Sequence, residues 1–171
     1  SPDINQRSGV SVRASVSNYE AILANALRRA IETGEQKVVP RISDLPFVMP
    51  SLQGKIEFEA MEEGREEKIM ERLFQDAVRS VFSRFAEGLD METLALTFAD
   101  GLHVTTGDSM ASEEYEGIIS RVDGLNDIVG KLAPSGSAAT RASAIEFVLE
   151  GLHLNQLLNK DRVGGRTTYT G

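Results

Sequence analysis

The stretch EGREEKIMERLFQDAVRSVFSRFA, residues 63–86, indicates a long amphipathic helix and a mainly α fold. Its apolar side chains recur at spacings of three and four residues, which is the period of one helix face. They form two adjacent rows: Ile69, Leu73, Ala77, Val81 and Phe85, then Met70, Phe74, Val78 and Phe82. Two rows make a stripe wide enough for two neighbouring elements. The stripe therefore predicts either the interior of a helical bundle or a groove for a partner protein.

Further helices are predicted on both sides of this one from capping residues and apolar periodicity. Ser15 is the expected N-cap of the first, and Gly34 is suited to the left-handed position just past its end. Asp90 and Ser112 are the expected caps of two others. The expected ranges are 15–33, 43–49, 90–98, 112–122, 125–132 and 138–159.

One segment alternates polar and apolar residues, as a strand does. In Lys55–Ala60, Ile56 and Phe58 would share one face, and residues 37–39 or 102–105 are candidate pairing partners. The predicted fold class is thus mainly α: a helical bundle with a small β element near residues 55–60. The segment DRVGGRTTYTG, residues 161–171, is polar and rich in glycine, so we expect a flexible tail there.

Composition excludes several classes of function. The 171-residue chain carries a net charge of -8, which argues against a protein that coats nucleic acid. It contains no cysteine, so it has no disulfide or thiolate metal site. No apolar run approaches the length of a membrane span, and the first ten residues lack the features of a signal peptide. We therefore expect a cytoplasmic protein without a membrane partner.

No motif in the sequence indicates a catalytic residue or a metal site. The string GLNDIVGKL, residues 124–132, has the wrong glycine spacing for a phosphate-binding loop and a leucine where a hydroxyl is required. His103 and His153 are single histidines without a carboxylate partner at helical spacing. Paired glutamates such as Glu113-Glu114 lie where helices begin, and there the helix dipole favours negative charge.

Two arginines near the start of the chain are the candidate binding residues. Arg7 and Arg13 precede or begin the first predicted helix. A guanidinium can form paired hydrogen bonds with phosphate oxygens, and a helix N-terminus also favours an anion. The alternative is an ordinary charged surface, which residue type alone does not exclude.

The sequence around Arg13 resembles the start of the helical lid of an AAA+ ATPase. The segment SGVSVR, residues 8–13, is similar to the one that opens the lid in bacterial magnesium-chelatase I-subunit-like or MoxR-like proteins, some of which are labelled sigma-54-interacting. Similar segments follow in order at residues 17–30, 39–59 and 144–160. The resemblance therefore covers most of the chain.

This resemblance implies that Arg13 is the sensor 2 arginine and contacts the γ-phosphate of ATP, with Arg7 in a supporting role. It implies an organisation in which residues 1–36 begin the lid, residues 37–160 complete it with a family-specific extension, and residues 161–171 are the tail. The P-loop, the Mg²⁺-binding acidic residue and the arginine finger belong to an N-terminal AAA+ module that these residues do not contain. The chain is then a C-terminal, non-catalytic fragment.

The whole protein would be an ATP-hydrolysing homo-oligomeric ring that binds ATP and Mg²⁺ and acts on a protein client, in a remodelling, chaperone-like or chelatase-like role. The lid would mediate subunit or partner contacts, and the fragment alone would hold no cofactor. The alternative is a stand-alone helical protein-interaction module with a transcription-regulatory role. Direct DNA binding is disfavoured because no helix-turn-helix carries a basic recognition helix.

Overall fold

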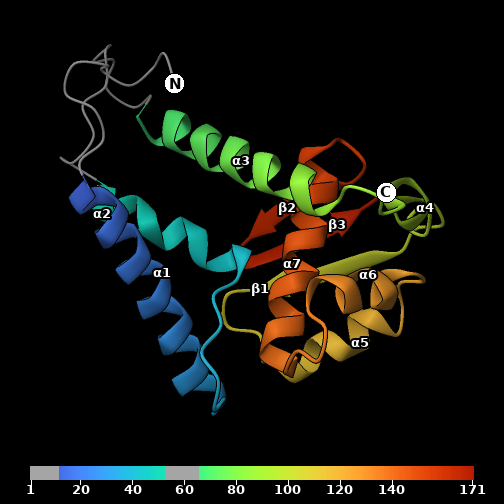
Figure 1. The fold of residues 1–171 in the computed structure, drawn as a ribbon, viewed down its shortest axis with the longest axis horizontal. Helices are drawn as coiled ribbons and strands as arrows, with labels where there is room; N and C mark the ends of the chain where they lie inside the picture. Colours follow the sequence, from blue (N-terminus) through green and yellow to red (C-terminus); the bar gives the residue numbers. More distant parts are fainter. Residues whose placement is uncertain (1–11, 53–65) are drawn as a thin grey trace.

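The computed structural model describes residues 12–52 and 66–171 and has a mainly α fold with a small antiparallel sheet (Figure 1). The mainly helical class is therefore confirmed. Arg7 and the strand predicted at residues 55–60 lie outside the described residues. Within the described part, the β element is formed by other segments of the chain.

The described elements follow one another along the chain as a series of helices interrupted by one strand and closed by a hairpin. In order they are α1 (Val12–Thr33), the 3₁₀ helix η1 (Ile42–Val48), α2 (Met49–Leu52), α3 (Glu66–Phe85), α4 (Met91–Leu96), β1 (His103–Gly107), the 3₁₀ helix η2 (Ser112–Tyr115), α5 (Glu116–Ile119), α6 (Leu125–Leu132), α7 (Ala138–Leu154), β2 (Asn159–Val163) and β3 (Arg166–Thr170).

Local sequence signals explain most of the helix ends. Gly34 has a φ of 72° directly after α1, in the left-handed conformation that favours glycine. Asp90 caps α4 by accepting a hydrogen bond from the Thr93 N–H at 3.0 Å. The helix predicted at 138–159 ends earlier, at Leu154, because Gln156 has a φ of 63° and redirects the chain into β2.

Two predicted helices differ in form from the expectation. The one expected at 43–49 is the 3₁₀ helix η1, which continues directly into α2. The one expected at 112–122 begins as the 3₁₀ helix η2 and ends with α5 at Ile119. Both helices are short, but each begins in the predicted region and buries side chains there.

The last residues of the chain form a hairpin, so the prediction of a flexible tail is wrong. β2 and β3 are antiparallel, β3 also pairs with β1, and the strand order is β1-β3-β2. Gly164 and Gly165 both have positive φ and make the two-residue turn that suits a hairpin. Tyr169 is 1% exposed and donates its hydroxyl to Glu150 at 2.8 Å, which attaches β3 to α7.

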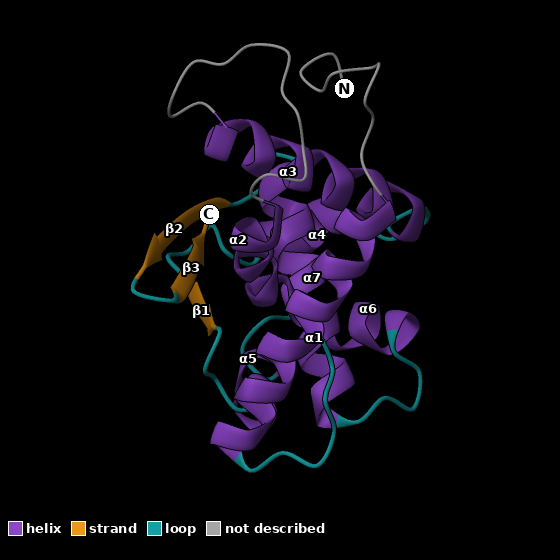
Figure 2. Cartoon of the chain, turned by 90° about the vertical axis from the view of Figure 1, so that its left-hand side faces the viewer, coloured by secondary structure: helices purple, strands orange, loops and turns teal. Residues whose placement is uncertain are grey.

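The main hydrophobic core surrounds α7, which lies centrally with α3 across it and α5 and α6 on its other side (Figure 1). Ile145, Val148, Leu149 and Leu152 of this helix are fully buried. Gly151 allows a close approach of α3, since a Cβ there would lie 2.1 Å from the Phe82 ring. The sheet lies beside the helices at one edge of the molecule (Figure 2).

The apolar stripe of α3 meets two neighbours, as its width predicts. Phe82 packs into the core around α7, whereas Met70 belongs to a smaller cluster with Ala14, Val48 and Leu52. Val81 and Phe85 are 43% and 58% exposed, so this end of their row lies at the surface. Of the helices described, none is long and apolar enough to cross a membrane.

Candidate functional site

Arg13 lies in the first turn of α1 and is exposed, whereas Arg7 lies outside the described residues. The first turn of α1 contains no acidic residue. From this end, one side of the helix presents large apolar side chains to solvent at spacings of three, four and eight residues. These form the apolar face of α1: Val12, Val16, Tyr19, Leu27 and Ile31, which are between 48% and 80% exposed.

The other side of α1 is buried and fixed to η1 by charged groups. The Arg29 guanidinium makes a paired contact with Asp44: Nη1 donates to Oδ1 at 2.5 Å and Nη2 donates to Oδ2 at 3.1 Å. Nη2 also donates to the Val39 carbonyl at 2.8 Å, and the Asn25 amide donates to Asp44 at 2.6 Å. Arg29 and Asp44 are 1% and 0% exposed, so this pair is removed from water.

A second buried cation connects the loop after α1 to η2. Arg41 donates to the Met110 carbonyl at 2.7 Å and to the Ser112 hydroxyl at 2.6 Å, and its guanidinium lies over the Tyr115 ring. Glu35 accepts hydrogen bonds from the Ser112 N–H and hydroxyl at 2.6 and 2.7 Å. Burial alone would raise the pKa of Glu35, but these hydrogen bonds and the charge of Arg41 together hold it below its usual value.

Glu146 is a fully buried carboxylate at the centre of this polar cluster. It accepts from the Ser43 N–H at 2.8 Å, from the Ser43 hydroxyl at 3.1 Å and from the Tyr115 hydroxyl. Burial raises the pKa of Glu146, and the hydrogen bonds from Tyr115 and Ser43 offset part of that rise. Because both of its oxygens already have donors, we interpret Glu146 as a structural group that joins η1 to α7.

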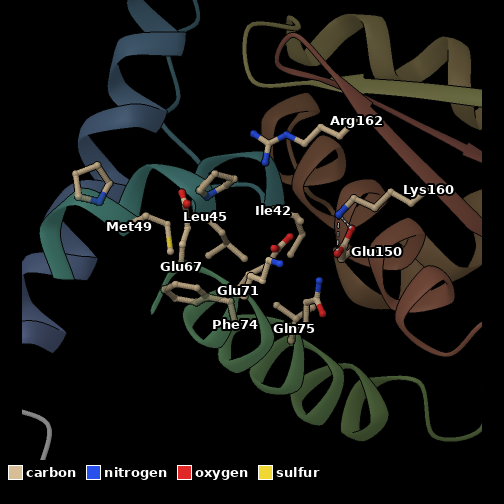
Figure 3. Close-up of a pocket in the computed structure, with 14 residues that line it drawn as sticks. Ile42, Leu45, Met49, Glu67, Glu71, Phe74, Gln75, Glu150, Lys160 and Arg162 are labelled. Atoms are coloured by element: carbon tan, nitrogen blue, oxygen red, sulfur yellow. Dashed lines mark hydrogen bonds and ion pairs between the residues drawn. The ribbon is translucent and has the colours of Figure 1, made fainter. Parts of the chain in front are cut away.

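A groove of about 590 Å³ lies between η1, α2, α3 and β2 (Figure 3). This volume falls in the range of sites for small ligands or short peptide segments. Its apolar wall comes from the η1–α2 segment and from α3: Ile42, Leu45, Pro46, Met49, Pro50, Phe74 and Val78.

Charged side chains surround the apolar wall of the groove. Lys160 of β2 donates to both carboxylate oxygens of Glu150, at 2.9 and 2.7 Å, and the two charges compensate each other (Figure 3). Arg162 extends from the same strand and is exposed. Glu67 and Glu71 stand on the opposite wall, on α3. The groove thus combines an apolar wall with a basic side at β2 and an acidic side at α3.

The other residues singled out in the sequence have structural roles. Residues 124–132 are not a phosphate loop, since Leu125–Leu132 is the helix α6. Nδ1 of His153 lies 3.0 Å from the Leu158 carbonyl, and Glu114 accepts from the Ala111 N–H at 2.9 Å where η2 begins. No group of three or more potential ligands within residues 12–52 and 66–171 could hold a metal ion.

Sequence reasoning did not find the groove. Its walls come from residues 42–50, 67–78 and 150–162, and no local pattern says that these segments meet. One available signal was the alternation in RTTYT after two glycines, which is typical of a hairpin. Taken as a hairpin, it would have predicted that Lys160 and Arg162 share one face of a strand.

Comparison of the chain with protein-family models, with curated proteins and with solved structures finds no match in any of the three.

Proposed function

We propose that this chain is the lid-like, non-catalytic part of an AAA+ ATPase, in which Arg13 senses ATP held by a P-loop module outside these 171 residues. One observation carries the proposal. An exposed arginine begins a long helix whose opposite side is fixed to the body of the protein by a buried ion pair. The resemblance of residues 8–13 to the sensor 2 segment gives that arginine its role.

The buried contacts explain how such an arginine could act at a distance. Arg29 ties α1 to Asp44 of η1, and the neighbouring Ser43 ties η1 to Glu146 of α7. A charge pair that is out of water tolerates little displacement, because separating its members leaves a charge uncompensated. A force applied at Arg13 by a nucleotide phosphate would therefore be transmitted to the core around α7.

The apolar face of α1 supports a contact role beside the sensing role. Exposed apolar side chains gathered along one helix mark a surface that another protein covers. In this proposal the P-loop module or a neighbouring subunit covers that face in a cytoplasmic homo-oligomeric ring, which binds ATP and Mg²⁺ and acts on a protein client.

The test uses the complete ATPase that contains this chain. Arg13→Ala should lower the rate of ATP hydrolysis by about 100-fold, the usual effect of removing one charge-stabilising donor from a reacting site. Arg84→Ala is the matched control, since Arg84 is also exposed but lies in the last turn of α3. The isolated 171-residue chain should neither bind nor hydrolyse Mg·ATP. Equal hydrolysis by the two variants, or ATPase activity of the isolated chain, would refute the proposal.

A second candidate is a stand-alone helical protein-interaction module, transcription-regulatory in role. The apolar face of α1 favours it as well, since such a face needs a protein partner but not a nucleotide. Tyr19→Ser with Ile31→Ser separates the two. If these changes abolish partner binding while Arg13→Ala changes nothing, the module is the better account.

A further inference from the structure

The two edge strands of the sheet, β1 and β2, differ in the contacts that the rest of the protein makes with their outward backbone groups. In the register of β1 with β3, the backbone groups of His103, Thr105 and Gly107 point outward. Arg121 donates to the His103 carbonyl at 2.7 Å, and the Tyr115 hydroxyl lies 3.4 and 3.5 Å from the backbone N and O of Gly107. The protein's own side chains therefore contact both ends of the β1 edge.

Among the described residues, none covers the β2 edge. Val163 and Arg166 flank the two-residue turn, so this pair exchanges hydrogen bonds, and the bonded pairs alternate from there along the hairpin. Lys160 and Arg162 then belong to the non-bonded pairs, and their backbone N–H and C=O groups point away from β3. No side chain among residues 12–52 and 66–171 is found bonded to these groups. Val163 is 71% exposed at the end of this strand.

The open edge adjoins the apolar wall of the groove. The Lys160 and Arg162 side chains line the same space as Ile42, Leu45 and Pro46 (Figure 3). An extended peptide paired with β2 would direct alternate side chains to this side, because successive residues of a strand point to opposite faces. Main-chain bonds then give affinity and the groove gives selectivity, as in other cases of strand addition.

Charge decides which peptide fits. Lys160 is compensated by Glu150, whereas no ion pair is found for the Arg162 guanidinium within the described part of the chain. An acidic side chain on the added strand would lie beside Arg162, and cross-strand pairs of opposite charge are favourable. Basic side chains at that position would be repelled by Arg162.

We propose that β2 is the receptor strand for an extended segment of a partner protein in which every second residue faces the groove and these groove-facing residues include both acidic and apolar side chains. The segment adds to the β2 edge, places an acidic side chain beside Arg162 and inserts an apolar side chain against Ile42 and Pro46. Arg13 does not line this groove, so the proposal does not depend on the nucleotide-sensing role.

The experiment titrates the full 171-residue chain with a labelled (Thr-Glu-Thr-Val)₃ peptide, in which glutamate and valine share one face of a strand, and compares it with (Thr-Lys-Thr-Val)₃. We expect at least tenfold weaker binding of the lysine peptide, and protection of the Lys160 and Arg162 amides from hydrogen exchange when the glutamate peptide binds. A glutamate peptide N-methylated at alternate amides cannot pair with a strand and should not bind. No binding of the glutamate peptide, or equal binding of its methylated form, would overturn the proposal.

A matched pair of variants separates the side chain from the backbone. Arg162→Ala removes the side chain beyond Cβ, including the guanidinium, but keeps the backbone N–H, and it should weaken binding several-fold. Arg162→Pro also removes the outward N–H, which the hairpin does not use, so it should weaken binding further. Circular dichroism checks that both variants fold. If the chain instead dimerises in ultracentrifugation and the peptide does not reverse this, the edge belongs to a second copy and the proposal fails.

Discussion

The core around α7 and the junction between α1 and η1 are both buried, but they are held together by different forces. The side chains of the core are almost all apolar, and α7 contributes residues on nearly every side. At the junction, the apolar cluster is small and the closest contacts are those of Arg29, Asp44 and Asn25. One region is held by removal of apolar surface from water, the other by oriented charge.

This difference bears on specificity. Apolar packing tolerates changes of shape provided that volume is kept, because the hydrophobic effect has no direction. A buried ion pair fixes one geometry, and it strongly destabilises the protein when only one member remains. The α7 core thus supplies stability, while the junction fixes the direction of α1 and with it the position of Arg13.

The largest effect is expected at the junction. Asp44→Ala leaves the Arg29 charge buried without a partner and should lower the free energy of unfolding by about 3–5 kcal/mol, measured by urea denaturation. Asp44→Asn keeps the shape and one oxygen acceptor but also removes the charge, so its loss should be nearly as large. A small loss for Asp44→Asn beside a large one for Asp44→Ala would mean that hydrogen bonding and not charge holds α1.

The core should respond next. Leu149→Ala removes a side chain that is 0% exposed and should cost about 2–5 kcal/mol, through lost apolar burial and the cavity left behind. Leu96→Ala is the control, because Leu96 is 70% exposed and its loss should cost less than about 0.5 kcal/mol. A small effect at Leu149 would contradict the central place of α7.

Glu146 makes the polar contact between these two regions, and it should make the free energy of unfolding depend on pH. The pKa of Glu146 in the folded protein is raised above its ordinary value of 4.5, mainly by burial. Between these two pKa values the folded state keeps a proton that the unfolded chain has lost, so stability falls as pH rises through this window. Glu146→Gln should remove that fall, which chemical denaturation at a series of pH values will measure. An unchanged pH profile would contradict the raised pKa.

The smallest effect is expected on the exposed side of α1. Glu32 accepts from Arg28 at 2.6 Å, but both side chains are more than a third exposed. Glu32→Gln should therefore cost only about 0.3–0.5 kcal/mol at low ionic strength, and nothing measurable in 1 M salt. A loss of several kcal/mol here would erase the distinction between buried and exposed charge pairs.

The positions of the helices could be predicted from local signals, since caps and apolar periodicity act within a few residues. The range Leu125–Leu132 and the cap at Asp90 agree with the structure. The sheet could not be predicted in the same way, because β1 pairs with a strand about sixty residues away in sequence. Of the candidate site residues, Arg13 is described as an exposed residue in a first helical turn, and its nucleotide contact stays a prediction.

By itself, the sequence determined that this chain is mainly helical, where most helices begin and that α3 must meet two neighbours, because each of these depends on hydrogen bonds and periodicity within one segment. Only the tertiary structure decided which charges are buried and where the sheet has an open edge. Ser43 and Glu146 are 103 residues apart, and no local pattern marks them as partners. Burial turns the same residue types from surface charges into fixed contacts, and burial is a property of the whole fold.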